Sequence, residues 1–260
     1  MTAGHESRFR LDGRVAVVTG GAGGICAAIC HAYAHVGARV ACLDFDREGA
    51  EKVAKAIRAE GGQALGIECD VSDESSVRQA IGQVHASWGL VDVLVSGAAI
   101  LDQTGTILDI DPAEWHRVMN VNLHGSYYIV RSVLPDMIRR GKGSVILVAS
   151  MHGSVGRPGR VSYTTGKAAL IMMARTMALD HAEQGVRFNT LSPGAVATRR
   201  IAFRYGEHAE EKLREAAQKY PLKRFAAPEE MVGAALFLAS DASSYMTGSD
   251  LLIDGGYVAG

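Results

Sequence analysis

The chain has 260 residues, of which 48% are hydrophobic and 21% charged. This composition excludes a disordered chain and a collagen-like fibre, and it suffices for one sizeable hydrophobic core. The 27 basic residues nearly balance the 28 acidic ones, so the net charge of -1 favours neither nucleic acid nor an anionic membrane, and a small molecule is the expected partner. No apolar run has the length of a signal peptide or a membrane span, which predicts a soluble protein of the cytoplasm.

Short β-branched runs alternate with longer amphipathic segments along the chain. This alternation is typical of parallel strands joined by crossover helices. Since the runs are apolar on consecutive residues, helices are expected to cover both faces of the sheet. The sequence therefore predicts the α/β class, with a doubly wound sheet of about seven parallel strands. The predicted strands are Val15 to Thr19, Arg39 to Leu43, Gln63 to Glu68, Val91 to Ser96, Ser144 to Ala149, Arg187 to Leu191 and Leu251 to Asp254.

No proline-rich or serine-rich linker and no internal repeat interrupts the alternation, so residues 1–260 are expected to form a single domain. The one departure is a polar, arginine-rich and helical segment at about 195–221, between the last two predicted strands. Inserts of this kind commonly close over a binding site. We expect this segment to be a lid over the substrate.

A glycine-rich turn, Thr19-Gly20-Gly21-Ala22-Gly23-Gly24-Ile25, follows the first predicted strand and precedes a helical pattern. Such a turn lets backbone N–H groups and a helix N-terminus approach a pyrophosphate. The second predicted strand is followed by Asp44, where a carboxylate would bind the adenosine ribose hydroxyls and repel a 2′-phosphate. The pattern thus predicts NAD rather than NADP. The alternative is that Asp44 is a solvated strand end or the N-cap of the next helix.

The four cysteines, Cys26, Cys30, Cys42 and Cys69, lie early in the chain and form no CxxC pair. No histidine stands near them at the spacing of metal ligands. They are expected to be reduced and mostly buried, and no metal site is predicted.

Tyr163 and Lys167 stand four residues apart in a helical pattern, so both side chains are expected on one face. Together with other ordered signals, this pair resembles the short-chain dehydrogenases/reductases, in their short single-domain branch. The resemblance covers residues 11–257. The other signals are the Gly20 to Ile25 turn, Asp70-Val71, Asn122, Ser150, Pro193-Gly194-Ala195-Val196-Ala197-Thr198, Thr247-Gly248 and Asp254-Gly255-Gly256.

The resemblance implies a Rossmann-type fold and four catalytic residues. Tyr163 would be the general acid/base, Lys167 would assist it and bind the nicotinamide ribose, Ser150 would hydrogen-bond the reacting oxygen, and Asn122 would hold a proton-relay water. Gly21 occupies a position where many NADP-using relatives carry a basic residue. The implied cofactor-binding residues are Gly20, Gly24, Ile25, Asp44, Asp70, Val71, Gly97, Ala98, Tyr163, Lys167, Pro193, Gly194, Val196 and Thr198.

The expected reaction is hydride transfer between NAD and a secondary alcohol or ketone, such as a polyol, sugar, hydroxy acid or cyclic alcohol. Two alternatives stay open on the same fold: an epimerase or dehydratase with tightly bound NAD, and a non-catalytic NAD-sensing protein. Ser150 is not predicted to be a hydrolase nucleophile, because it lacks the Gly-x-Ser-x-Gly setting.

Two departures from the family pattern concern the cofactor side. Cys26 replaces the third glycine of the first turn, so a slight outward shift of the first helix is expected. Ser96-Gly97-Ala98-Ala99 stands where the family usually has Asn-Asn-Ala-Gly, which removes two amide side chains near the adenosine side.

Two further expectations concern the surface. The segments 127–130 and 170–174 are apolar around the whole helix, which predicts a homotetramer in which a neighbouring subunit covers them. Five arginines near the predicted lid favour a substrate with an anionic or highly polar end, the alternative being solvated surface arginines. These are Arg157, Arg160, Arg199, Arg200 and Arg204.

Overall fold

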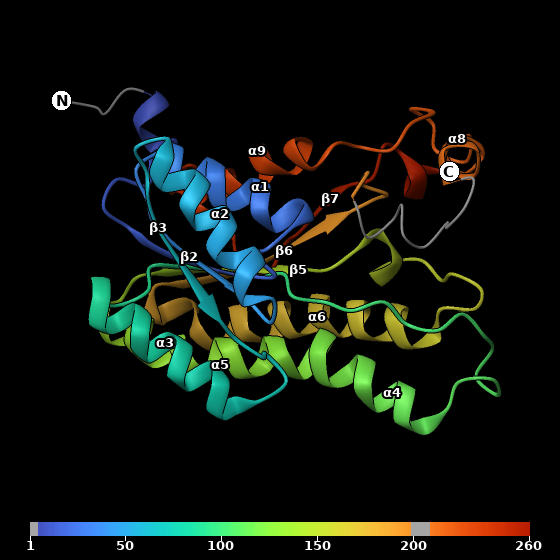
Figure 1. Ribbon diagram of the computed structural model, residues 1–260, viewed down its shortest axis with the longest axis horizontal. Helices are drawn as coiled ribbons and strands as arrows, with labels where there is room; N and C mark the ends of the chain where they lie inside the picture. The colour runs from blue at the N-terminus through green and yellow to red at the C-terminus, as the bar shows by residue number, and fades with distance from the viewer. Residues whose placement is uncertain (1–4, 199–208) are drawn as a thin grey trace.

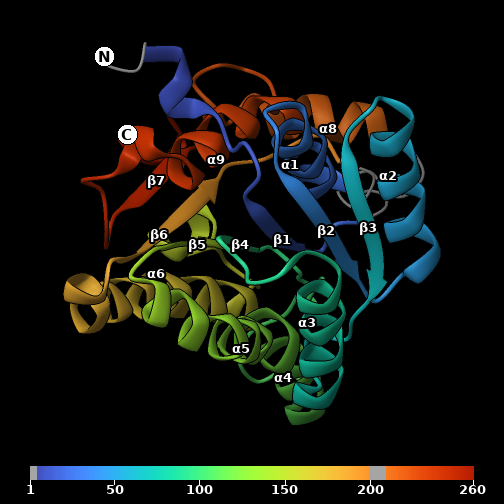
Figure 2. The same ribbon diagram turned by 90° about the vertical axis from the view of Figure 1, so that its left-hand side faces the viewer.

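The computed structural model describes residues 5–198 and 209–260. Its seven strands form one parallel sheet (Figure 1), in the order β3-β2-β1-β4-β5-β6-β7 that can be followed in Figure 2. The order reverses between β1 and β4, which places a crevice at the carboxyl ends of the central strands. The strands are β1 Val15–Thr19, β2 Arg39–Asp44, β3 Gln63–Glu68, β4 Val93–Ser96, β5 Gly143–Val148, β6 Val186–Pro193 and β7 Asp250–Ile253.

All seven predicted strands are present, and the bounds of β1 and β3 match the prediction. The others differ by one or two residues at an end, where sequence patterns are least informative. The prediction of a doubly wound parallel sheet is confirmed.

Helices cover both faces of the sheet (Figure 2). One face carries α1 Gly24–His35, α2 Arg47–Ala59 and α9 Val232–Ala239, and the other carries α3 Glu74–Trp88, α5 Gly125–Arg140 and α6 Val161–His181. A separate hydrophobic core lies on each face, because the strands are apolar on both sides. The remaining described α-helices are α4 Pro112–Met119 and α8 Ala209–Ala217.

The helix starts differ in a way that bears on the site. Asp46, Asp73 and Asp111 cap α2, α3 and α4, each accepting a hydrogen bond from a main-chain N–H of the first turn. The N-cap residues of α1 and α6, Gly23 and Arg160, have no capping side-chain bond. Both of these N-termini border the cavity described below.

A π-helical turn, Asn120–His124, joins α4 to α5. Such turns are rare and occur most often at functional sites, because they displace one residue out of the regular helical repeat. Here the displaced segment contains Asn122, which is buried.

The predicted lid at 195–221 is described in part. Val196 pairs with Ala226 in an isolated parallel bridge, and α8 supplies the expected helical character. Arg199, Arg200 and Arg204 lie outside the described residues.

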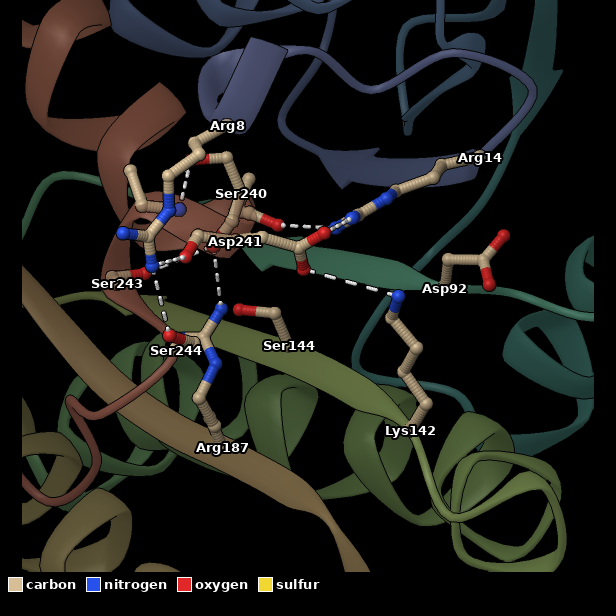
Figure 3. Close-up of polar contacts among 12 residues, drawn as sticks. Arg8, Arg14, Asp92, Lys142, Ser144, Arg187, Ser240, Asp241, Ser243 and Ser244 are labelled. Atoms are coloured by element: carbon tan, nitrogen blue, oxygen red, sulfur yellow. Dashed lines mark hydrogen bonds and ion pairs between the residues drawn. The ribbon is translucent and has the colours of Figure 1, made fainter. Parts of the chain in front are cut away.

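The amino end of the sheet holds a charged cluster around Asp241, beside a cavity of about 510 Å³ (Figure 3). Arg14 contacts the Asp241 carboxylate at 2.6 Å, and Lys142 lies 3.8 Å from it. Arg187 donates to three main-chain carbonyls at 2.9 to 3.3 Å. Burial alone would raise the pKa of Asp241, but Arg14, Lys142 and Arg187 together lower it below its ordinary value. The cluster joins β1, β5 and β6 to the segment before β7.

The four cysteines are buried, as predicted, and none of them forms a disulfide. Among residues 5–198 and 209–260, no three histidine, cysteine, aspartate or glutamate side chains gather as metal ligands would. A search of the same residues finds no helix with the length and hydropathy needed to cross a bilayer.

Candidate active site

A cavity of about 530 Å³ opens at the carboxyl ends of β1, β2, β4, β5 and β6. Its walls are the glycine-rich turn, the ends of these strands, the start of α6 and Tyr220. Ligands of open α/β sheets bind at this edge, because the order of the strands reverses there.

The glycine-rich turn packs tightly on one side and is open on the other. Gly20 has a positive φ of +74°, and a Cβ there would lie 3.0 Å from the main chain of Ala98. A Cβ at Gly21 would lie 3.0 Å from the Cα of Cys42, whereas one at Gly23 would meet no atom within 4 Å. The turn therefore presents main-chain groups and the uncapped N-terminus of α1 to the cavity, the arrangement that suits a phosphate.

Asp44 is fixed against this turn. One carboxylate oxygen accepts a hydrogen bond from Ala22 N–H at 3.0 Å, and the other accepts one from Asp46 N–H at 3.0 Å. The residue that caps α2 is Asp46, so the alternative of Asp44 as that N-cap is wrong. Asp44 instead lines the cavity.

Tyr163 and Lys167 both line the cavity from the first turns of α6. Lys167 is buried, and its Nζ donates to the Val148 carbonyl at 2.7 Å and lies 5.8 Å from the centre of the Tyr163 ring. The π-helical turn packs beside this part of α6, since a Cβ at Gly166 would make an ordinary contact with the Asn122 Cβ at 4.0 Å. The Tyr163 hydroxyl forms no hydrogen bond with the part of the chain that the structure describes, which leaves it available to a ligand.

Ser150 follows β5 and is buried at the cavity wall. Its Oγ accepts a hydrogen bond from His152 N–H at 3.2 Å, which fixes the side chain. The hydroxyl proton can still be donated to a substrate oxygen.

Asn122 lies beneath the cavity rather than on its wall. Its Oδ1 accepts from Ile100 N–H at 2.7 Å, and its Nδ2 donates to the Ile100 carbonyl at 3.2 Å. The amide thus joins the π-helical turn to the loop after β4, behind Tyr163.

Twelve of the predicted site residues line this one cavity. Four do not: Asn122, Asp70, Val71 and Ala98. Asp70 accepts two hydrogen bonds from Ser72, and Val71 packs against α5, so both organise the turn after β3. The residues on the cavity wall are Gly20, Gly24, Ile25, Asp44, Gly97, Ser150, Tyr163, Lys167, Pro193, Gly194, Val196 and Thr198.

The two departures from the family pattern compensate each other. A Cβ at Gly97 would overlap the sulfur of Cys26, so the cysteine side chain fits because residue 97 has none. The buried Ser96 hydroxyl donates to the Ser126 hydroxyl at 2.9 Å. Thr19 Oγ1 accepts from the N–H groups of Gly97 and Ala98 at 3.0 and 3.2 Å. The loop after β4 is therefore hydrogen-bonded without the two usual amide side chains.

Several wall residues were not among the predicted ones, notably Leu101, Met151, His152 and Tyr220. His152 stands two residues after Ser150, so its place on the cavity wall could have been predicted from the sequence. Tyr220 is distant in the chain from the other site residues, so no sequence signal indicated its place. Burial lowers the pKa of His152 to about 4, with help from the charges of Arg157 and Arg160. The imidazole is consequently neutral at pH 7.

The two arginines of this region have different partners. Arg157 is exposed at the cavity mouth and its Nη1 lies 3.2 Å from His152 Nε2, with no carboxylate partner among the described residues. Arg160 is buried and forms an ion pair with Asp102. Of these two arginines, Arg160 is neutralised by Asp102, whereas Arg157 has a positive charge that a ligand can pair with.

Comparisons with known proteins identify the family. Residues 20–258 match a family model described as enoyl-(acyl carrier protein) reductase. The chain is 38% identical over 251 residues to D-threitol dehydrogenase of Mycolicibacterium smegmatis, covering 96% of this chain and 94% of that protein. It is 39% identical over 246 residues to cis-4-hydroxycyclohexanecarboxylate dehydrogenase of Sinomonas cyclohexanicum, covering 95% and 97%.

A solved structure of a gluconate 5-dehydrogenase from Burkholderia cenocepacia J2315, in complex with NADP and tartrate, superposes with a TM-score of 0.90. The two chains are 34% identical, with 98% of each covered. Full-length similarity at this level, on a seven-stranded parallel sheet with Tyr163 and Lys167 at its crevice, establishes the family. The chain belongs to the short-chain dehydrogenase/reductase family and acts by hydride transfer on secondary alcohol or ketone substrates.

Proposed function

We propose that this protein is an NAD-dependent dehydrogenase that interconverts a secondary alcohol and a ketone, with residues 1–260 as one catalytic domain. The observation that carries the proposal is the convergence of Ser150, Tyr163 and Lys167 on a cavity whose far wall is the glycine-rich turn. Proton-transfer groups and a phosphate-binding turn share one space, as a reaction between a dinucleotide and an alcohol requires.

The residues present fit a nicotinamide dinucleotide. The open side of the turn at Gly23 and the uncapped start of α1 would hold the pyrophosphate, and Lys167 would hold the nicotinamide ribose. The cofactor, when bound, supplies or accepts the hydride.

Preference for NAD is supported by the two residues beside the ribose position. Asp44 has its carboxylate fixed at the edge of the cavity, where it would bind hydroxyls and repel a phosphate. Gly21 is so close to Cys42 that a basic side chain there would need the strand to move. NADP in a structural relative belongs to a different chain and does not carry over to these residues.

The chain's own residues handle the proton. In alcohol oxidation, the Tyr163 phenolate accepts the proton of the substrate hydroxyl, and in ketone reduction the phenol returns it. Ser150 donates a hydrogen bond to the same oxygen and orients it. Lys167, whose ammonium lies 5.8 Å from the centre of the Tyr163 ring, would assist the tyrosine and bind the nicotinamide ribose. Asn122 holds the main chain of the adjoining loop.

For the substrate, we propose a small hydroxylated molecule with an anionic or highly polar end. Arg157 lies at the mouth of the cavity with no carboxylate partner among the described residues and can bind a carboxylate in a bidentate manner. Two relatives are named for acids, a hydroxycyclohexanecarboxylate and gluconate, whereas another is named for the neutral polyol D-threitol, so the proposal of an anionic end rests on Arg157. Residues 195–221 would close over this molecule.

A homotetramer in the cytoplasm completes the proposal. Tyr127 on α5 and Met172 and Leu179 on α6 are 47%, 57% and 84% exposed, so apolar surface on these two helices is left for another subunit. Light scattering at micromolar concentration tests the assembly, and a monomeric mass would contradict it.

The test of the function is NADH formation by the purified protein with threitol, gluconate and cis-4-hydroxycyclohexanecarboxylate, each with NAD and with NADP. We expect turnover with NAD and a higher kcat/KM for an acid than for the neutral polyol. An Arg157→Gln variant should raise KM for the acid and leave that for the polyol nearly unchanged. Turnover without net cofactor reduction, or no turnover of any alcohol, would contradict the proposal.

A further inference from the structure

Two charged side chains are buried beside Tyr163 and have no role in the chemistry proposed above. Asp102 lies in the loop after β4, and Arg160 is the N-cap residue of α6. They form an ion pair in which the side chains of Arg160 and Asp102 are 5% and 1% exposed. Burying two charges costs desolvation free energy, so a well-packed apolar pair of similar size is often equally stable or more stable. Stability alone therefore does not account for this pair.

Asp102 holds the main chain of Tyr163. The N-cap residue of α6 has no capping side-chain bond of its own. Instead, Asp102 Oδ2 accepts a hydrogen bond from Tyr163 N–H at 3.3 Å. A carboxylate at this place satisfies an orphan N–H group and is favoured by the helix dipole. A side chain from a different loop thus caps the helix at the residue that carries the phenol.

Arg160 holds the ring of the same tyrosine. Its guanidinium carbon lies 5.0 Å from the centre of the Tyr163 ring, within the range of a cation–π contact. The ion pair with Asp102 fixes the guanidinium, so the main chain and the ring of Tyr163 are held by the two members of one pair.

The pair also joins Tyr163 to a wall of the cavity. Gly105 pairs with Arg160 in an isolated parallel bridge, and its N–H donates to the Gly159 carbonyl at 3.1 Å. Farther back in this loop, the Leu101 carbonyl accepts a hydrogen bond from Arg117 at 2.9 Å. These contacts hold the loop after β4 against the start of α6, where Tyr163 lies. Leu101, in the same loop, lines the cavity, so the contacts also fix part of the cavity wall.

We propose that Asp102 and Arg160 are positioning residues for Tyr163, which hold the phenol at the height and orientation that proton transfer requires and fix the loop after β4 against it. The inference rests on the proposed role of Tyr163 as acid/base. Proton transfer is sensitive to displacements well below 1 Å, so loosening the ring lowers the rate of the chemical step without necessarily weakening substrate binding.

The test is the double variant Asp102→Leu/Arg160→Met, which removes both charges and leaves neither one buried alone. We expect a folded protein with an unfolding midpoint close to that of the wild type, a kcat lowered by about tenfold or more and a KM for the best alcohol of the panel within about threefold. Amide hydrogen exchange should be faster in the peptide that spans residues 160–167, because Tyr163 N–H has lost its acceptor.

A second variant and a control separate the contributions. Asp102→Asn keeps an oxygen for Tyr163 N–H but removes the charge that fixes Arg160, so kcat should fall while exchange of the Tyr163 amide changes little. The control is Glu74→Gln/Arg78→Gln, which removes an exposed ion pair on α3 and likewise leaves the net charge unchanged. Its kcat, KM and exchange in 160–167 should equal those of the wild type.

Tyr163→Phe is measured beside these variants to separate the inference from the proposed function. Full activity of Tyr163→Phe would overturn the function. An inactive Tyr163→Phe together with a folded double variant of wild-type kcat would overturn the positioning role alone. A raised KM with unchanged kcat would assign Arg160 to substrate binding and also overturn it. If the double variant does not fold, the decisive measurement is the kcat of Asp102→Asn. A wild-type kcat for that variant would overturn the positioning role.

Discussion

The two ends of the sheet carry cavities of nearly the same size, about 530 Å³ at the carboxyl end and about 510 Å³ at the amino end. At the amino end, Arg14, Lys142 and Arg187 are bound by Asp241 and by main-chain carbonyls (Figure 3). At the carboxyl end, the glycine turn, open at Gly23, and Tyr163 line the cavity.

This difference separates charge that supports the fold from charge that is available for chemistry. Polar groups whose bonds are all made within the protein stabilise it, whereas groups directed into a cavity gain their partners from a ligand. Substitutions at the carboxyl end should therefore lower turnover with little loss of stability. Substitutions at the amino end should lower stability with little loss of turnover.

The largest expected effect is that of Lys167→Met at the carboxyl end. The substitution keeps a long apolar stem but removes the ammonium beside Tyr163, so kcat should fall by about 10²- to 10⁴-fold. Loss of the hydrogen bond from Nζ to the Val148 carbonyl should lower the unfolding free energy by about 1 kcal/mol. Steady-state kinetics and urea unfolding measure the two quantities. A stable variant with wild-type kcat would remove Lys167 from the mechanism.

At the amino end, Arg187→Met removes the three hydrogen bonds that the guanidinium donates to the main-chain carbonyls of Leu238, Ser240 and Met246. At about 1 kcal/mol for each lost hydrogen bond, the unfolding free energy should fall by about 3 kcal/mol. The kcat of the folded fraction should stay within about twofold of the wild type, since Arg187 lies at the opposite edge of the sheet. A large loss of kcat without loss of stability would show that the two ends are not separate in this way.

The carboxyl end of the sheet was largely predictable from the sequence, whereas the charged cluster at the amino end was not predicted. The apolar runs and the glycines predict the sheet and the phosphate-binding turn, because strand and turn chemistry is local. Ser150, Tyr163 and Lys167 were predicted from residue type, spacing and the family resemblance, and all three line the cavity. The buried pair of Asp102 and Arg160 was not predicted as a pair, because it joins two loops whose contact depends on how the sheet brings them together.

The fit of Cys26 beside Gly97 illustrates the same limit. Each residue alone is a departure from the family pattern, and their mutual contact is visible only in three dimensions. An outward shift of α1 was predicted from the bulk of Cys26 alone. That prediction did not include the space that the missing side chain of Gly97 leaves for the Cys26 sulfur. The role expected for Asn122, holding a proton-relay water, stays a prediction, and the hydrogen bonds of its side chain to Ile100 could not be read from the sequence.

A smaller effect is expected for cofactor choice at the carboxyl end. Asp44→Ala removes the carboxylate that would repel a 2′-phosphate, so the ratio of kcat/KM for NAD to that for NADP should fall by about tenfold or more. Some loss with NAD itself is expected, because Ala22 N–H also loses its acceptor. Equal use of NAD and NADP by the wild-type protein would contradict the role given to Asp44.

The smallest expected effect concerns pH and His152. Its pKa of about 4 in the folded protein lies below the ordinary value of 6.5, so as pH falls from about 6.5 to 4 the unfolded chain binds a proton that the folded protein does not. Stability should fall over this window, and His152→Asn should reduce that fall by about 1–2 kcal/mol. The control is His31→Asn on α1. The same pH dependence in His152→Asn and wild type would contradict the burial of a neutral imidazole.

The most direct test of the central claim is the kcat of Tyr163→Phe measured together with its affinity for NADH. The substitution keeps the ring that contacts Arg160 and Lys167 and removes only the group that transfers the proton. The account predicts a loss of kcat of about 10²- to 10⁴-fold, with NADH affinity, by fluorescence titration, within about threefold of the wild type and unchanged stability. A kcat near that of the wild type, or loss of NADH binding in place of turnover, would contradict the assignment of the chemistry to Tyr163.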